Sequence, residues 1–245
     1  MEKVKISIVS YSNTIPFVHG IENSNCLSLD SFELSKDTPA ICYEKIKNNE
    51  ADIGLIPVAT IPTLNNVEII SDYCIGSEGK VKSVILASHV PLKEIKQVYL
   101  DYQSKTSNQL VQILARLHWK QNFDFVFSKP GYENSINGNK AGVIIGNRAL
   151  EIRDKFPYVY DLAGEWYDFT GLPFVFACWV QNKEIPIEFI DNFNNALQFG
   201  ISKINMLTIN KPALNSYLTK NINHFLDERK KEAIELFWML NKNKA

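Results

Sequence analysis

The chain has 245 residues, of which 45% are hydrophobic and 22% are charged, and its formal net charge is -1. This composition is typical of a globular protein that buries a core as one large domain or two small ones. A charge near zero, without any basic run, gives no field that would gather nucleic acid, so nucleic-acid binding is excluded as the main function.

Membrane and metal-cluster proteins are also disfavoured. No apolar segment approaches the roughly 20 residues that a membrane helix needs, and the first residues, MEKVKISIVSYSN, hold too short an apolar run for a signal peptide. We therefore expect a cytoplasmic protein with no membrane partner. The cysteines are scattered without a CxxC pair, which predicts buried thiols rather than metal, redox or disulfide sites. They are Cys26, Cys42, Cys74 and Cys178.

The first part of the chain alternates predicted strands and helices. Periodicity predicts strands at residues 4–10, 27–34 and 52–58, and a helix at 38–49 with Thr38 as its cap. This order indicates right-handed βαβ units and a largely parallel sheet.

Asn13 lies where the first predicted strand gives way to a helix, in the run YSNTIP (11–16). Asn and Thr cap helices, and Pro fits the first helical turn. The amide of Asn13 and the backbone N–H groups around it could therefore bind an anion. The alternative is that Asn13 is a plain N-cap.

Two apolar runs, at residues 81–86 and 172–180, are separated by much of the chain. They indicate a lobe that one crossing strand enters and another leaves, with a ligand bound in the cleft between two lobes. Ser83 stands at the start of the first crossing and is therefore a candidate for the chemistry. Its position alone does not specify a reaction.

The segment between the crossings again alternates, with strands predicted at 97–100, 123–127 and 141–145 and helices after 107 and at 148–156. Ser104, Thr106 and Ser107 gather at the start of one helix, where hydroxyl and N–H groups could hold a carboxylate or a phosphate. Capping alone is the alternative. Gly146 and Asn147 lie at a strand-to-helix junction, the usual ligand side of such sheets. Further helices are predicted at 187–204 and 229–240.

Motifs of strong catalysts are missing from the sequence. It has no GxSxG, HExxH, Walker or GxGxxG motif, and its four histidines are scattered. We expect His118 to be structural, and His19 is a minor candidate for the cleft. The polar candidates hold hardly any strong acid or base, which by itself indicates a small-carboxylate binding protein. An enzyme of this kind would need weak groups or the substrate itself for proton transfer.

Six runs of the sequence together resemble the chorismate dehydratase family, and the resemblance covers nearly the whole chain up to about residue 180. The runs are YSNTIPF (11–17), ADIGLIPVA (51–59), IGSEGKVKSVIL (75–86), LDYQSKTS (100–107), VIIGNRAL (143–150) and DLAGEWYDFTGLPFVFACW (161–179). The resemblance implies the type II periplasmic-binding-protein-like fold, with two α/β lobes joined by two crossing strands and a cleft between them. The implied lobes are 1–85 plus 181–245, and 86–180.

The resemblance also implies an activity, that of a hydro-lyase in the futalosine route to menaquinone. Such an enzyme removes water from chorismate to give 3-[(1-carboxyvinyl)oxy]benzoate, without metal or cofactor. The Asn and the Ser implicated in catalysis in the family fall on Asn13 and Ser83. The expected substrate-binding residues are Tyr11, Thr14, Ser104, Thr106, Ser107, Gly146 and Asn147.

Two other functions stay open. The related naphthoate synthase of the same pathway shares the fold but matches the motifs less well, and a non-catalytic small-carboxylate binding protein would explain the lack of a base. The sequence departs from the family pattern at Ser12, where Leu is common, and at Asn147, where Asp is usual. Lys82 and Lys105 replace arginines, and Lys cannot make a bidentate contact with a carboxylate.

Overall fold

The computed structural model describes residues 3–242 and divides the chain into two compact α/β units. The first unit comprises Met1–Gly76 and Val175–Glu228, and the second comprises Ser77–Phe174 and Arg229–Ala245. The expected lobes had other boundaries, at 85/86 and 180/181, with the C-terminal helix in the first lobe. That helix groups with the second unit because its Phe237 packs edge-on against Trp166 and Phe174.

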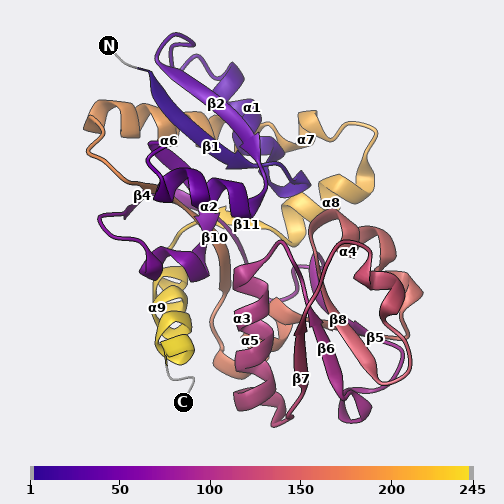
Figure 1. Cartoon of the computed structure of the whole chain (residues 1–245). Coiled ribbons are helices and arrows are strands. Elements are labelled where there is room, and N and C mark those ends of the chain that lie inside the picture. The colour runs from indigo at the N-terminus through magenta and orange to yellow at the C-terminus, as the bar shows by residue number, and fades with distance from the viewer. Residues whose placement is uncertain (1–2, 243–245) are drawn as a thin grey trace. The chain divides into compact units, whose positions relative to one another are not determined.

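The first unit is built on a mixed sheet, whose order within the described residues is β11-β4-β10-β3-β1-β2 (Figure 1). Strand β1 runs parallel to β2 and β3, whereas β10 is antiparallel to β3 and β11 is antiparallel to β4. The bounds are β1 (Val4–Val9), β2 (Phe32–Asp37), β3 (Ile53–Pro57), β4 (Glu68–Ser77), β10 (Phe174–Gln181) and β11 (Asn223–Phe225).

The second unit has its own mixed sheet, whose order within the described residues is β7-β6-β8-β5-β9. Strand β6 is parallel to β7 and β8, and β5 is antiparallel to β8 and β9. The three strands from which a largely parallel sheet was expected, β1, β2 and β3, are parallel, but the whole first sheet is mixed because β10 and β11 pair antiparallel. The bounds are β5 (Val84–Ser88), β6 (Gln97–Leu100), β7 (Asp124–Phe127), β8 (Lys140–Ile145) and β9 (Tyr158–Asp161).

Helices follow most of the strands. Those of the first unit are α1 (Ile15–Asn23), α2 (Pro39–Lys47), α6 (Ile187–Ser202), α7 (Ile204–Leu207) and α8 (Pro212–Lys220). Those of the second are α3 (Lys105–Ile113), α4 (Gly146–Ile152), α5 (Leu162–Thr170) and α9 (Glu228–Lys242), and α3 continues as a π-helical segment, Leu114–Trp119. Short 3-10 turns are η1 (Ser12–Thr14), η2 (Val58–Thr63), η3 (Leu92–Glu94), η5 (Tyr132–Ser135) and η6 (Arg153–Lys155).

Most expected elements form, but the strand expected at 27–34 begins later in the structure, as β2 at Phe32. Residues 28–31 make a turn, in which the backbone N–H of Ser31 donates to the carbonyl of Ser28 at 2.9 Å. Leu27 is buried because it packs into the core of the first unit from this turn. Strands β4, β9 and β11 were not expected from the sequence.

Helix α1 is held tightly against α6, as Figure 1 shows at the top of the first unit. A Cβ atom on Gly20 would overlap the backbone oxygen of Ala196, and one on Gly200 would overlap the backbone oxygen of Pro16. Only glycine therefore allows the two backbones to approach this closely. Because α1 directly follows the turn that carries Asn13, this contact also fixes where that turn lies on the first sheet.

All four cysteines carry free thiols, and Cys42, Cys74 and Cys178 are buried whereas Cys26 is half-buried. Burial raises the pKa of the Cys42 thiol to about 12. Along residues 3–242, no helix is both long enough and apolar enough to cross a membrane.

Candidate functional site

The turn after β1 has a defined shape, which the hydroxyl of Thr14 fixes. Thr14 Oγ1 lies 2.5 Å from the carbonyl oxygen of Val9 and 2.8 Å from that of Tyr11, and it accepts from the Tyr11 N–H at 3.4 Å. Thr14 is 1% exposed. Its side chain therefore links the end of the strand to η1.

Asn13 is not the N-cap of a helix, so that alternative is wrong. The cap position before η1 is Tyr11, and the one before α1 is Thr14. The side-chain oxygen Oδ1 of Asn13 is buried and has no hydrogen-bond partner among the described residues. A buried acceptor without a donor costs about 1–3 kcal/mol, so a hydrogen bond donated to this oxygen would be stabilising. Asn13 is not among the residues that line the neighbouring hollow.

A hollow of about 300 Å³ opens on the first unit beside this turn. Tyr11 and Thr14 line it, which places two of the expected substrate-binding residues at one hollow. Lys36 and Glu22, also on its wall, form an ion pair at 2.8 Å. His19 lines it too, and its ring stacks on Phe199 with centroids 5.9 Å apart.

In the second unit, Ser83 and Gly146 are neighbours. The backbone N–H of Gly146 donates to the carbonyl of Ser83 at 2.8 Å, at the point where β5 and β8 begin to pair. Ser83 is 2% exposed. The carboxylate of Asp161 fixes the preceding loop, because it accepts from the N–H groups of Val81 at 3.1 Å and Lys82 at 2.6 Å.

The cluster of hydroxyls at the start of α3 caps that helix. Ser104 Oγ accepts from the N–H of Ser107 at 3.1 Å and lies 2.8 Å from Ser107 Oγ. Thr106 and Ser107 are both buried, at 2% and 1% exposed. The capping interpretation is therefore confirmed for Ser104, while anion binding at this helix start stays a prediction.

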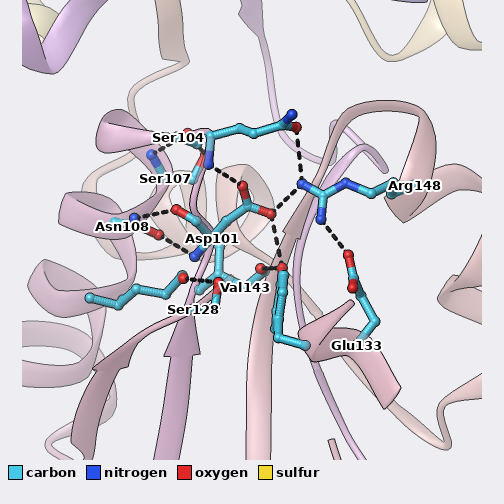
Figure 2. Close-up of polar contacts among 11 residues, drawn as sticks. Asp101, Ser104, Ser107, Asn108, Ser128, Glu133, Val143 and Arg148 are labelled. Carbon is cyan, nitrogen blue, oxygen red and sulfur yellow. Dashed lines mark hydrogen bonds and ion pairs between the residues drawn. The ribbon is translucent and has the colours of Figure 1, made fainter. Parts of the chain in front are cut away.

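Figure 2 shows a polar network that joins the loop after β6 to the start of α4. Arg148 Nη2 lies 2.6 Å from Asp101 Oδ2 and 3.2 Å from Gln103 Oε1, and Nη1 pairs with Glu133 Oε1. The Tyr132 hydroxyl donates toward Asp101 Oδ2 at 2.8 Å and contacts the carbonyl of Val143. The guanidinium also stacks over the Tyr102 ring, 4.9 Å from its centroid.

Asp101 also holds the loop that leads to α3. Its Oδ1 accepts from the N–H of Gln103 at 2.8 Å, and its backbone exchanges two hydrogen bonds with the Asn108 amide, at 2.8 and 2.7 Å. The carboxylate is thereby bound to groups on three sides: the loop, Tyr132 and Arg148. This shapes the turn that carries Ser104.

The network sets two carboxylates, Asp101 and Glu133, against the one guanidinium of Arg148. Burial raises the pKa of the Asp101 carboxyl, and the nearby Arg148 charge opposes that rise. Burial also lowers the pKa of Arg148, but Asp101 and Glu133 outweigh it, so that pKa lies above its ordinary value. Because two carboxylates already neutralise Arg148, the guanidinium serves as a brace between turns rather than as a receptor for another carboxylate.

The structure distributes the expected site residues over both units. Asn13, Tyr11 and Thr14 share one turn of the first unit. The second unit holds Ser83 beside Gly146, Ser104 beside Ser107, and also Thr106 and Asn147, of which Asn147 is exposed. Within the described residues, no three His, Cys, Asp or Glu side chains gather as a metal site would require.

Sequence reasoning missed the residues that brace these turns. Asp101 lies in the run LDYQSKTS and directly follows a predicted strand, a signal that could have found it. Arg148 lies in α4, where a helix was expected, but no role was predicted for its side chain. Tyr132 and Glu133 lie in η5, a short turn without a pattern of its own. His224, whose ring bonds to the backbone of Asn13, is far from it in sequence and offers no local signal.

Comparisons with known proteins agree with this architecture. The family model described as menaquinone biosynthesis matches residues 4–242. A chorismate dehydratase of Thermus thermophilus is 25% identical over 210 residues, which make up 76% of this chain and 72% of that protein.

Solved structures share the fold. A protein of Archaeoglobus fulgidus has a TM-score of 0.73 at 12% identity, with 99% of this chain and 97% of that one covered. A Candida albicans protein with the generic periplasmic binding protein fold has a TM-score of 0.66 at 13% identity, with 98% of this chain and 91% of that one covered. The periplasmic aliphatic sulphonate binding protein SsuA of Escherichia coli has a TM-score of 0.60 at 12% identity, with 100% of this chain and 94% of that one covered. The fold is thus periplasmic-binding-protein-like, and with its family match over nearly all of its length the chain belongs to the menaquinone biosynthesis family.

Proposed function

We propose that this protein is a chorismate dehydratase, a hydro-lyase that converts chorismate to 3-[(1-carboxyvinyl)oxy]benzoate. The observation that carries the proposal is the relative of that name, 25% identical over 76% of this chain, inside a family of menaquinone biosynthesis. The unpartnered Oδ1 of Asn13 supports it independently, because it is a buried acceptor in the turn that the resemblance marks.

The reaction requires little chemical assistance. The ring carbon–oxygen bond to the hydroxyl breaks, and the neighbouring ring carbon that bears the ether loses its proton. The electron pair of that C–H bond completes the aromatic ring, and the proton and the hydroxyl leave together as water. Since aromatisation drives the reaction, holding the substrate in a reactive geometry supplies much of the remaining rate.

Asn13 and Ser83 are the residues to which we assign this task. The Oδ1 of Asn13 would accept a hydrogen bond from the leaving hydroxyl, which removes the desolvation cost of that buried oxygen. Ser83, buried directly before β5, would orient a carboxylate or the hydroxyl through its own hydroxyl group. Each assignment comes from the family resemblance and agrees with the local geometry.

The ring proton goes, in this proposal, first to the enolpyruvyl carboxylate of chorismate itself, which then passes it to the departing hydroxyl, so that water leaves and the carboxylate is regenerated. The carboxylate of Asp101 is a poor base for it, because Arg148, Tyr132 and the Gln103 N–H already occupy its oxygens. None of the residues assigned to the substrate is a strong base. A carboxylate in the substrate is held beside the reacting carbon by its own covalent tether.

We keep the substrate-binding residues that the family resemblance implies. The residues proposed to contact the substrate are Tyr11, Thr14, Ser104, Thr106, Ser107, Gly146 and Asn147. A carboxylate at the start of α3 would be favoured by the helix dipole. A cytoplasmic location and the absence of a cofactor remain predictions that go with this activity.

The test is direct. The purified protein is mixed with chorismate, after dialysis against a chelator, and the product is followed by mass and ultraviolet absorbance. We expect loss of one water and the appearance of an aromatic product, and a loss of turnover in Asn13→Ala and Ser83→Ala. Unchanged turnover in both variants would overturn the assignment of these residues, and no turnover by the natural sequence would overturn the function.

A binding protein for small carboxylates is the second candidate. It is favoured by the solute-binding proteins among the structures that share this fold, SsuA being one. The same experiment separates the two, because saturable binding of chorismate without any product, measured by calorimetry, would indicate a receptor. Turnover would exclude a purely binding role.

A further inference from the structure

His224 lies on β11, and its ring is directed into the first unit rather than to solvent. The residue is 5% exposed, whereas the next residue along the strand, Phe225, is 54% exposed. Its Nε2 lies 3.0 Å from the backbone carbonyl oxygen of Asn13. A buried histidine therefore touches the turn that carries the unpartnered amide oxygen.

The direction of this hydrogen bond follows from the chemistry of the two groups. A carbonyl oxygen only accepts, so the proton is on Nε2 and His224 donates. Burial lowers the pKa of His224 to about 4, an effect that the bond to Asn13 opposes. At neutral pH the ring is thus uncharged, with a fixed tautomer that suits a permanent structural bond.

The position of the ring is set by its own strand. Strand β11 pairs with β4 through Asn223 opposite Gly76 and Phe225 opposite Tyr73, so the register shifts at His224. Irregularities of this kind redirect side chains and are frequent beside functional sites. The edge of the ring also meets Phe17 of α1, with centroids 5.0 Å apart and planes at 71°.

The Asn13 turn is consequently tied at two places. Thr14 Oγ1 joins η1 to Val9 and Tyr11, and His224 joins the carbonyl of Asn13 to β11. With its backbone fixed on both sides, Asn13 retains only its side-chain torsions, and its Oδ1 stays buried without a partner.

We propose that His224 is a positioning residue, which holds the backbone of Asn13 through Nε2–H so that the Asn13 amide faces the substrate correctly. This inference rests on the proposed function for its consequence in catalysis. The hydrogen bond itself does not depend on the proposed function. The bond and its effect on catalysis are therefore measured separately.

The bond is tested first, without any substrate. Nuclear magnetic resonance of protein labelled with nitrogen-15 histidine reports the tautomer of each ring. The His224 signals are those that disappear in His224→Gln, and we expect them to show a neutral ring with its proton on Nε2 at pH 7. In uniformly nitrogen-15-labelled protein, the Asn13 side-chain amide signal should shift in His224→Leu and stay close to its natural position in His224→Gln. An Nδ1–H tautomer or a protonated ring at pH 7 overturns the proposal. If His224→Gln fails to fold, the His224 signal is assigned by elimination, by replacing His19, His89 and His118 one at a time.

Kinetics with chorismate then test the role. Misplacing a reacting group by about 1 Å can cost about 100-fold in rate, so we expect His224→Leu to lose about 100-fold in kcat with KM nearly unchanged. His224→Gln, which keeps an N–H near the Nε2 position, should recover most of the loss. The matched control is His89→Leu, at an exposed histidine of the second unit, which should change neither constant.

A double variant decides whether His224 acts through Asn13. If it does, His224→Leu adds no further loss to that of Asn13→Ala. Losses that multiply, or equal losses in His224→Leu and His224→Gln, would overturn the positioning role. If the natural protein does not dehydrate chorismate at all, the proposed function fails, while the resonance measurements still decide the hydrogen bond.

Discussion

Arg148 Nη2 and Asp101 Oδ2 lie 2.6 Å apart, and they join the start of α4 to the loop between β6 and α3. The Asp101 side chain is fully buried and that of Arg148 is 27% exposed. Glu133 and Gln103 occupy the remaining directions of the guanidinium. The two turns that carry Ser104 and Asn147 are therefore held by one ion-pair network.

Asp101→Asn should destabilise the second unit strongly. The substitution removes the buried one of the two carboxylates that pair with Arg148 and leaves only Glu133, so we expect a loss of about 1–3 kcal/mol. Urea unfolding followed by fluorescence would measure the loss. The matched control is Asp154→Asn, whose partner Arg153 is close by but whose side chain is 96% exposed, and which should change stability by less than about 0.5 kcal/mol. Equal midpoints for the two variants would contradict the bracing role.

The strands and turns around this network could be predicted from the sequence, but its side-chain contacts could not. Strands β1, β3, β6 and β8 and the turns after them follow from apolar periodicity and from capping residues, so the candidate positions at strand ends were accessible. The partners of Arg148 come from separate loops, and only the folded chain brings them together. Strand β11 has three residues, too few to leave a periodic signal, and it takes its place in the sheet from pairing with β4.

Gly20→Ala should separate α1 from α6. The added methyl group would overlap the backbone oxygen of Ala196, and a backbone cannot yield as a flexible side chain can. We expect a loss of more than about 2 kcal/mol in unfolding free energy and a lower kcat, because α1 follows the Asn13 turn. The control is Gln198→Ala at an exposed position of α6, with an expected change within about 0.5 kcal/mol. A Gly20→Ala protein as stable as the control would show that the helices can move apart freely.

Thr14→Val should act on the turn more than on the substrate. Val keeps the shape of the side chain but removes the hydroxyl that bonds to the carbonyls of Val9 and Tyr11. The Tyr11 carbonyl still accepts from the Thr14 N–H at 3.1 Å, so the loss comes mainly from the bond to Val9, and we expect about 1–3 kcal/mol. Thermal unfolding should show the loss, and Thr14→Ser, which keeps the hydroxyl, should restore most of it. If stability is unchanged while KM for chorismate rises, Thr14 is a direct substrate ligand instead.

The stability of the protein should fall in mild acid because of His224. The ordinary pKa of histidine is 6.5, and burial lowers that of His224 to about 4 in the folded protein. Between these two pH values His224 is protonated in the unfolded chain but neutral in the folded protein. The unfolding free energy therefore decreases as the pH falls from 6.5 toward 4, and the contribution of His224 stops changing below pH 4. From pH 7 to pH 5 this amounts to about 2 kcal/mol. Urea midpoints at the two pH values should therefore differ more for the natural sequence than for His224→Gln, which has no titrating group there, and the same difference in both proteins would mean that position 224 does not govern the acid sensitivity.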